Sequence, residues 1–132
     1  MLRTVRLASV VAAAVAFTSA MSTPAEARPR TRQTGIASFY HDMFHGRQMA
    51  DGGRFSQHSN YAASRTLPFG TIAVVTNNRN GRSAVVRIRD RGPYVGGRIV
   101  DLSRATATQL GFREQGVAPV TLRVAYLPPP RR

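Results

Sequence analysis

The chain has 132 residues, no cysteine and a formal net charge of +13, and all 19 of its basic residues are arginines. The lack of cysteine excludes a disulfide framework and a cysteine-borne lipid anchor. So strong a positive charge predicts an anionic partner, which in an intracellular protein would favour nucleic acid.

The N-terminal segment is typical of a secretory signal peptide. Arg3 and Arg6 precede an apolar run over residues 7–21, and Ala25-Glu26-Ala27 fits a small-residue cleavage site. The run is shorter than the ~20 residues that a membrane span needs. We therefore expect residues 1–27 to be removed and the protein to be exported to the periplasm or cell envelope with no stable membrane anchor. Export makes anionic envelope polymers candidate partners and argues against nucleic acid.

The mature chain, about 100 residues, fits one domain. Residues 28–34 combine arginine with proline and lack apolar periodicity, so we expect a flexible basic arm. A first strand is predicted over residues 35–40. A glycine-punctuated loop follows over residues 41–54, and long ordered loops are often functional. The sequence around residues 60–63 allows one helical turn.

The remaining predicted elements are, in chain order, strands over residues 71–76, 82–90, 98–101 and 120–126 and a helix over residues 104–110. Asn80-Gly81 is a hairpin signal between the first two of these strands. Ser103 is a good N-cap for the helix, and Gly111 suits the position after its end. Residues 128–132 form a Pro/Arg tail. This pattern indicates a small all-β domain over residues 35–127, closed or nearly closed into a barrel because an open sheet would expose its edges.

Asp90 stands where the most regular strand ends. Val86, Ile88 and Asp90 share one face of that strand, so a carboxyl group continues an apolar row. Gly92-Pro93 then ends the strand, because proline cannot donate to a ladder. Alternation turns the neighbouring arginines to the other face: Arg87, Arg89 and Arg91. The sequence thus predicts a carboxyl group at the end of a strand, on its apolar face.

A series of motifs resembles the RlpA family, the rare lipoprotein A or septal ring lytic transglycosylase proteins. The motifs are GIASFY at 35–40, FHGR at 44–47, TLPFGT at 66–71, NGRS at 80–83, VRIRDRGPY at 86–94 and GRIVDLSRA at 97–105. The resemblance implies a six-stranded double-psi β-barrel with one or two short helices. It also implies an envelope enzyme that cleaves peptidoglycan glycan strands to 1,6-anhydro-muramyl ends. We expect a monomer that needs no cofactor and no metal.

The resemblance also assigns site residues. Asp90 is the expected acid/base, and the expected substrate-binding residues are His45, Arg47, Arg91, Tyr94 and Asp101. Two family positions differ, because Gly53 and Ser64 stand where family members carry a glutamate and a histidine. Hydrolysis ordinarily needs two carboxyl groups, whereas in transglycosylation the sugar's own C6 hydroxyl attacks C1, so one carboxyl group can suffice. The alternative is a non-catalytic peptidoglycan-binding barrel that has lost both groups.

Several candidates also have structural interpretations. Asp90 alternatively holds turn amides or pairs with an arginine, and Asp101 alternatively satisfies the helix start. His41 and His45 would share a helix face, but the loop composition argues against a zinc site. His58 is a candidate substitute for the missing histidine. Four aromatic residues are candidates either for sugar stacking or for the core: Tyr40, Phe44, Tyr61 and Tyr94.

Overall fold

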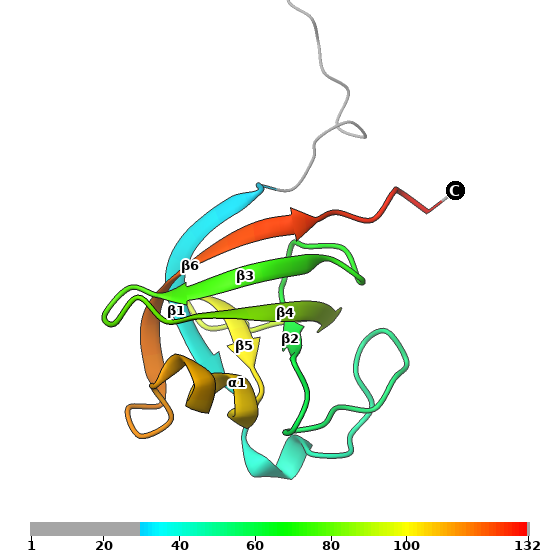
Figure 1. The fold of residues 1–132 in the computed structure, drawn as a ribbon. Helices are drawn as coiled ribbons and strands as arrows, with labels where there is room; N and C mark the ends of the chain where they lie inside the picture. The colour runs from blue at the N-terminus through cyan, green and yellow to red at the C-terminus, as the bar shows by residue number, and fades with distance from the viewer. Residues whose placement is uncertain (1–29, 132) are drawn as a thin grey trace, which may run out of the picture.

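Six strands close into a barrel in the computed structural model, which describes residues 30–131. The elements are β1 (Arg32–Phe39), η2 (Asp42–Phe44), β2 (Tyr61–Ala63), β3 (Ile72–Asn77), β4 (Ser83–Asp90), β5 (Arg98–Leu102), α1 (Arg104–Leu110) and β6 (Val117–Tyr126). The hydrogen-bonded order is β1-β5-β2-β4-β3-β6 (Figure 1). The β1/β5 and β2/β4 pairs are parallel and the others antiparallel. The predicted six-stranded double-psi β-barrel is confirmed. The predicted signal peptide, residues 1–27, lies outside the described residues.

β1 is longer than predicted. Residues 32–34 pair with residues 121–123 of β6, so a flexible arm through Thr34 is wrong for these positions. Strand pairing uses backbone groups and does not require apolar side chains, which is why the missing periodicity was misleading. β6 itself begins at Val117, before the predicted start at Val120, and so offers partners to β1 from Arg32 to Ser38.

β2 replaces the helical turn predicted at residues 60–63. Tyr61 and Ala62 pair in parallel with β4, while Ala63 pairs with Asp90 on one side and with Asp101 of β5 on the other. Ala62 and Ala63 are each 1% exposed. Their small side chains let this short strand pass between β4 and β5, and tertiary packing overrides the weak local preference for a helical turn.

The hairpin and the helix follow the predictions. β3 and β4 pair antiparallel around the Asn80-Gly81 turn. The Ser103 side chain accepts from the Thr106 N–H, and Gly111 adopts the left-handed conformation with φ 75°. The Nδ2 groups of Asn77 and Asn80 each donate to the Leu110 carbonyl at 2.9 Å. The hairpin therefore supplies donors to the C-terminal end of α1, which lies beside β4 and β1.

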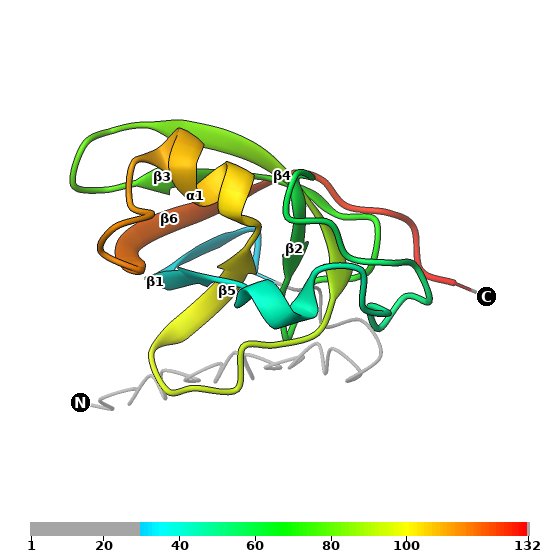
Figure 2. The ribbon, with the colours of Figure 1, turned by 90° about the horizontal axis from the view of Figure 1, so that it is seen from below.

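The barrel interior holds a continuous apolar core, including Val75, Val86, Ile88, Val100 and Leu122. The loop over residues 45–60 lies on the side of the barrel opposite the β3–β4 hairpin tip (Figures 1 and 2). Figure 2 shows η2 beside the end of β1 and near the segment that links β4 to β5. In the part of the chain described here, no helix combines the length and apolarity needed to cross a bilayer.

Candidate functional site

A groove of about 540 Å³ opens where β1 and β4 end, between η2 and the segment that links β4 to β5. Its lining includes most of the predicted site residues: Arg47, Asp90, Arg91, Tyr94 and Asp101. Tyr40 and Ser38, at the end of β1, line it too. The topology explains this meeting. β1 and β5 run in parallel, as do β2 and β4, and Ala63 at the end of β2 pairs with Asp101 near the end of β5.

Asp90 lies half-buried in this groove and accepts three hydrogen bonds. The Tyr40 hydroxyl donates to Oδ2 at 2.6 Å, and the N–H groups of Ala50 and Arg91 donate to Oδ1 at 2.8 and 2.9 Å. No ion pair to Asp90 occurs within residues 30–131. Asp90 therefore does hold turn amides, but it is not sealed by an arginine and still faces the groove.

The arginines beside Asp90 are engaged elsewhere, as the strand alternation predicted. Arg89 pairs with Asp51 at 2.6 Å and lies 4.4 Å from the Tyr61 ring centroid. Arg91 donates to the Ser64 and Leu67 carbonyls at 3.1 and 2.8 Å. Its guanidinium also covers the Phe69 ring at 3.9 Å. Arg91 thus borders the groove while its charged end anchors the turn over residues 64–70.

Tyr40 is the partner of Asp90 that the sequence analysis missed. Its ring lies 4.1 Å from that of Phe55 and 5.9 Å from that of Phe44. Burial first, and then the hydrogen bond and charge of Asp90, raise the pKa of Tyr40 far above its usual value, so the hydroxyl stays a donor. Side chains alternate along a strand, so Ser38 and Tyr40 share one face of the strand predicted over residues 35–40, and this pattern was the available signal.

Asp101 occupies the same groove on β5. The Ser38 hydroxyl donates to its Oδ1. Burial raises the pKa of Asp101 and outweighs the Ser38 hydrogen bond and the Arg98 charge, which lower it, while the Asp90 charge adds to the rise. Asp101 does not satisfy the start of α1, because Ser103 and Gln57 accept from the first N–H groups of that helix. That structural interpretation is therefore wrong.

The two positions that depart from the family lie outside the groove lining. A Cβ at Gly53 would meet the Arg89 guanidinium at 2.2 Å, so the space beside this glycine is filled by an arginine that pairs with Asp51. Ser64 is buried, and its hydroxyl accepts from the Thr66 and Leu67 N–H groups at 3.2 and 3.1 Å. In this chain both positions organise loops.

The Asp51–Arg89 pair predicts a pH-dependent contribution to stability. Burial alone would raise the pKa of Asp51, but the Arg89 hydrogen bond, the Gly53 N–H and nearby positive charge together lower it below 3.8. A lowered folded-state pKa stabilises the protein above the unfolded-state value and loses that effect as the pH falls through the folded-state value. Asp51→Asn should therefore lower the melting temperature at pH 7 and lower it less at an acidic pH well below 3.8, the ordinary pKa of the carboxyl group. Equal effects at both pH values would contradict this role.

His45 and His58 do not meet Asp90. They line a separate pocket of about 260 Å³ with Asp42, Gln57 and Arg104. Their ring centroids are 5.7 Å apart, and the His45 Nδ1 accepts from the Gln57 N–H at 3.0 Å. The structure thus does not bring His45 into the groove where the sequence analysis expected it, nor does His58 replace the missing histidine there.

The candidate aromatic residues divide between two places. Tyr94 is 77% exposed and Phe44 is 41% exposed, and both line the groove. Tyr61 lies under Arg89 and outside the groove lining. Tyr94 and Phe44 are therefore the exposed aromatic rings of the groove.

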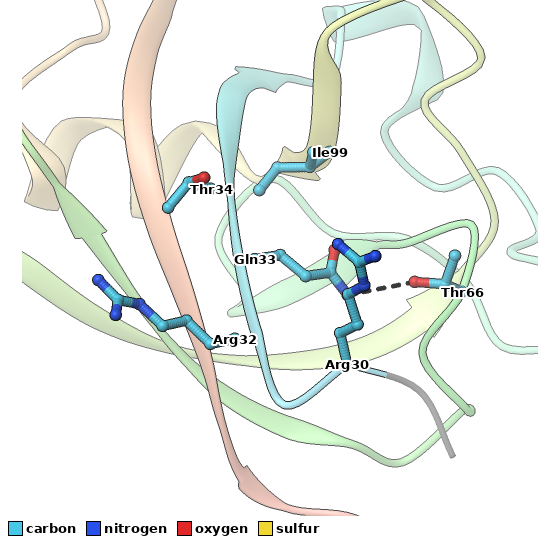
Figure 3. A pocket seen from close by; sticks show the side chains of 6 residues that line it. All are labelled: Arg30, Arg32, Gln33, Thr34, Thr66 and Ile99. Carbon is cyan, nitrogen blue, oxygen red and sulfur yellow. Dashed lines mark hydrogen bonds between the residues drawn. The ribbon is translucent and has the colours of Figure 1, made fainter. Parts of the chain in front are cut away.

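A larger hollow of about 620 Å³ lies near the start of β1 (Figure 3). It is lined by Arg30, Arg32, Gln33, Thr34, Thr66 and Ile99. Figure 3 shows Gln33 directed toward Thr66, to which its Nε2 donates at 3.2 Å. None of these six described residues carries a carboxyl or imidazole group, the groups that proton transfer commonly requires. The Asp90 groove is the stronger candidate for chemistry.

The family model and the similar curated proteins point to the same family. The sequence model described as "Lytic transglycolase" matches residues 32–122. A probable endolytic peptidoglycan transglycosylase RlpA of Synechocystis is 56% identical over 90 residues, covering 68% of this chain and 28% of the relative. An endolytic peptidoglycan transglycosylase RlpA of Neisseria meningitidis is 48% identical over 90 residues, covering 68% of this chain and 38% of the relative. The chain thus spans well under half the length of these relatives.

Solved structures share the fold. The Streptomyces papain inhibitor superposes with a TM-score of 0.58 and 26% identity, covering 72% of this chain and 94% of the inhibitor. An expansin of Clavibacter michiganensis, solved with cellohexaose, gives a TM-score of 0.55 and 19% identity, covering 76% of this chain and 53% of the expansin. At that identity the expansin supports the fold alone.

Proposed function

Because the chain belongs to the lytic transglycolase family, we propose that its barrel is an endolytic peptidoglycan transglycosylase of the RlpA type. The observation that carries this proposal is the Asp90 carboxylate, held by Tyr40 and two backbone N–H groups in an open groove. Among residues 30–131 no arginine pairs with it. The similarity to named RlpA transglycosylases over most of the barrel supports the same substrate class.

The reaction needs no water. The C6 hydroxyl oxygen of a muramyl unit attacks C1, the bond from C1 to the leaving glycosidic oxygen breaks, and a 1,6-anhydro ring forms. The leaving oxygen takes up a proton, and the C6 hydroxyl gives one up. Asp90 takes part in this proton transfer as the acid/base group, and Tyr40, Ala50 and Arg91 fix its orientation.

The groove rim supplies substrate contacts. Arg47, on the loop after η2, is exposed at the rim, and Tyr94 presents a largely free ring. Arg91 and Asp101 line the groove beside Asp90, so they would contact the bound glycan strand there. We assign His45 no direct contact, because it lies in the separate histidine pocket.

Tyr94→Ala should raise the KM for glycan strands by about 3- to 10-fold with a smaller effect on kcat, because the ring stacks on a sugar face. The matched control is Tyr126→Ala, since Tyr126 is 54% exposed but does not line the groove. Steady-state kinetics on a soluble glycan would check this prediction. An equal rise in KM for both variants would contradict a specific stacking role.

The proposed setting is the cell envelope, reached through a cleaved signal peptide. There the monomeric barrel acts on glycan strands. Loss of Arg3, Arg6 and Glu26 with the signal peptide leaves a net charge of +12, which favours additional contact with anionic envelope polymers. Retention on purified peptidoglycan that weakens with added salt would support the electrostatic part.

Product analysis tests the proposed reaction. The protein is incubated with purified glycan strands, and the soluble products are analysed by mass spectrometry. Products that end in 1,6-anhydro-muramyl units are expected. Their absence, with a protein shown by circular dichroism to be folded, would overturn the proposal.

A non-catalytic peptidoglycan-binding barrel is the second candidate function. The observation in its favour is that Gly53 and Ser64, at the two family positions, contribute neither a carboxyl nor an imidazole group. Glycan binding without any anhydro product would favour it. Release of anhydro products by the wild-type protein and not by Asp90→Asn would exclude it.

A further inference from the structure

Two carboxyl groups share the groove, and the strand register explains why. Ala63 of β2 pairs with Asp90 of β4 and with Asp101 of β5. Neighbouring strands lie about 4.8 Å apart, so the backbone positions of the two aspartates are separated by roughly 10 Å across the short β2 strand. Both side chains line the same groove. A glycan strand that passes Asp90 must therefore also pass Asp101.

The two carboxyl groups have different surroundings. Asp90 accepts from three donors, which address both of its oxygens. Asp101 accepts one side-chain hydrogen bond, from Ser38 to Oδ1, and no hydrogen bond within the described residues reaches its Oδ2. Burial raises the pKa of Asp101. Pairs of carboxyl groups whose environments differ in this way commonly divide the acid and base roles between them.

Resting on the proposed transglycosylation, we infer that Asp101 is a second catalytic group, which protonates the leaving glycosidic oxygen while Asp90 accepts the proton of the C6 hydroxyl. The bond from C1 to the leaving oxygen breaks, and that oxygen takes the proton from the Asp101 carboxyl. The C6 oxygen bonds to C1, and its proton passes to Asp90. A proton then returns from Asp90 to Asp101 through water in the groove, so no other reactant is consumed.

This division gives each aspartate a task that its contacts suit. Three donors among the described residues hold both oxygens of Asp90 in place as acceptors, which suits it to accept a proton. Asp101 keeps Oδ1 on Ser38 and leaves Oδ2 to present a proton to the groove. Ser38 lies on β1 opposite Asp101 in the strand register, so it orients the carboxyl group and acts as a positioning residue.

A leaving-group experiment tests the assignment, after the wild-type protein has been shown to form anhydro products from glycan strands. Asp101→Asn should lower kcat on glycan strands by about 10²- to 10⁴-fold. On a muramyl glycoside with an aryl leaving group that departs as a phenolate without protonation, its loss should be under about 10-fold. Asp90→Asn should be impaired on both substrates. Binding and melting curves confirm that both variants are folded.

Two outcomes would overturn the assignment: wild-type turnover by Asp101→Asn on glycan strands, or an equally large loss on both substrates. If the wild-type protein forms no anhydro product at all, the proposed transglycosylase function itself is wrong. That outcome differs from either result that would refute only the role of Asp101.

A second variant tests the same role without touching either aspartate. The groups that act on the Asp101 charge are Ser38 on β1, Arg98 on β5, Asp90 on β4 and Tyr40 after β1. The Ser38 hydrogen bond lowers the pKa of Asp101, so Ser38→Ala raises it. In a plot of kcat against pH, activity falls on the alkaline side as Asp101 loses its proton. This alkaline limb should then move to higher pH. Ser83→Ala, an exposed change on the hairpin, should leave the limb unmoved. A Ser38→Ala limb that stays or moves to lower pH would contradict the assignment.

Discussion

Asp90→Asn is expected to lower the release of anhydro-muramyl products by about 10²- to 10⁴-fold, the range that a positioned proton-transfer group typically contributes. The amide keeps an oxygen for the Ala50 and Arg91 N–H groups, and its NH₂ can donate to the Tyr40 hydroxyl, which accepts as well as donates. The barrel should therefore remain folded and still bind glycan strands. Rates come from product analysis and binding from co-sedimentation with purified peptidoglycan.

The matched control is Glu114→Gln, which also removes one negative charge. Glu114 is exposed on the segment between α1 and β6, away from the groove. Turnover by the Glu114→Gln variant should equal that of the wild-type protein. Turnover by Asp90→Asn at the same level as Glu114→Gln would remove Asp90 from the mechanism.

Gln57→Leu should lower the free energy of unfolding by about 2 to 4 kcal/mol, because it orphans two polar groups at once. Gln57 is 4% exposed, and its Nε2 donates to the Tyr40 carbonyl at 2.8 Å while its Oε1 accepts from the Arg104 N–H at 2.8 Å. One side chain thus joins the long loop, the end of β1 and the start of α1. Urea unfolding followed by circular dichroism measures the effect.

The matched control is Gln109→Leu, the same chemical change at an exposed position of α1. Its effect on stability should stay within about 0.5 kcal/mol. Because Gln57 holds the backbone of Tyr40, which in turn orients Asp90, Gln57→Leu should also reduce turnover in the remaining folded protein. Equal stability losses for the two glutamine variants would contradict the bridging role of Gln57.

The sequence predicted the elements that carry strong local signals. Asn80-Gly81 marked the hairpin, Ser103 and Gly111 marked the ends of α1, and the alternation before Gly92-Pro93 placed Asp90 at a strand end with its neighbouring arginines turned away. These features depend on backbone geometry and on residues close together in the chain. They can therefore be predicted without knowledge of the tertiary structure.

The rest depends on contacts between distant segments. β2 forms because Ala62 and Ala63 fit between β4 and β5. Local sequence propensity does not indicate this long-range packing. Tyr40 meets Asp90, and Gln57 meets Arg104, only after the barrel has closed. His45 matched a family motif but lies in another pocket, because the fold of the loop, and not the motif itself, decides which way the ring faces.

The central claim is that the groove promotes intramolecular transfer at a muramyl C1. Digestion of glycan strands in water enriched with ¹⁸O measures it directly, because hydrolysis places solvent oxygen on C1 and transglycosylation does not. The account predicts products that carry 1,6-anhydro ends without ¹⁸O. Reducing ends labelled with ¹⁸O, or intact strands after incubation with folded protein, would contradict it.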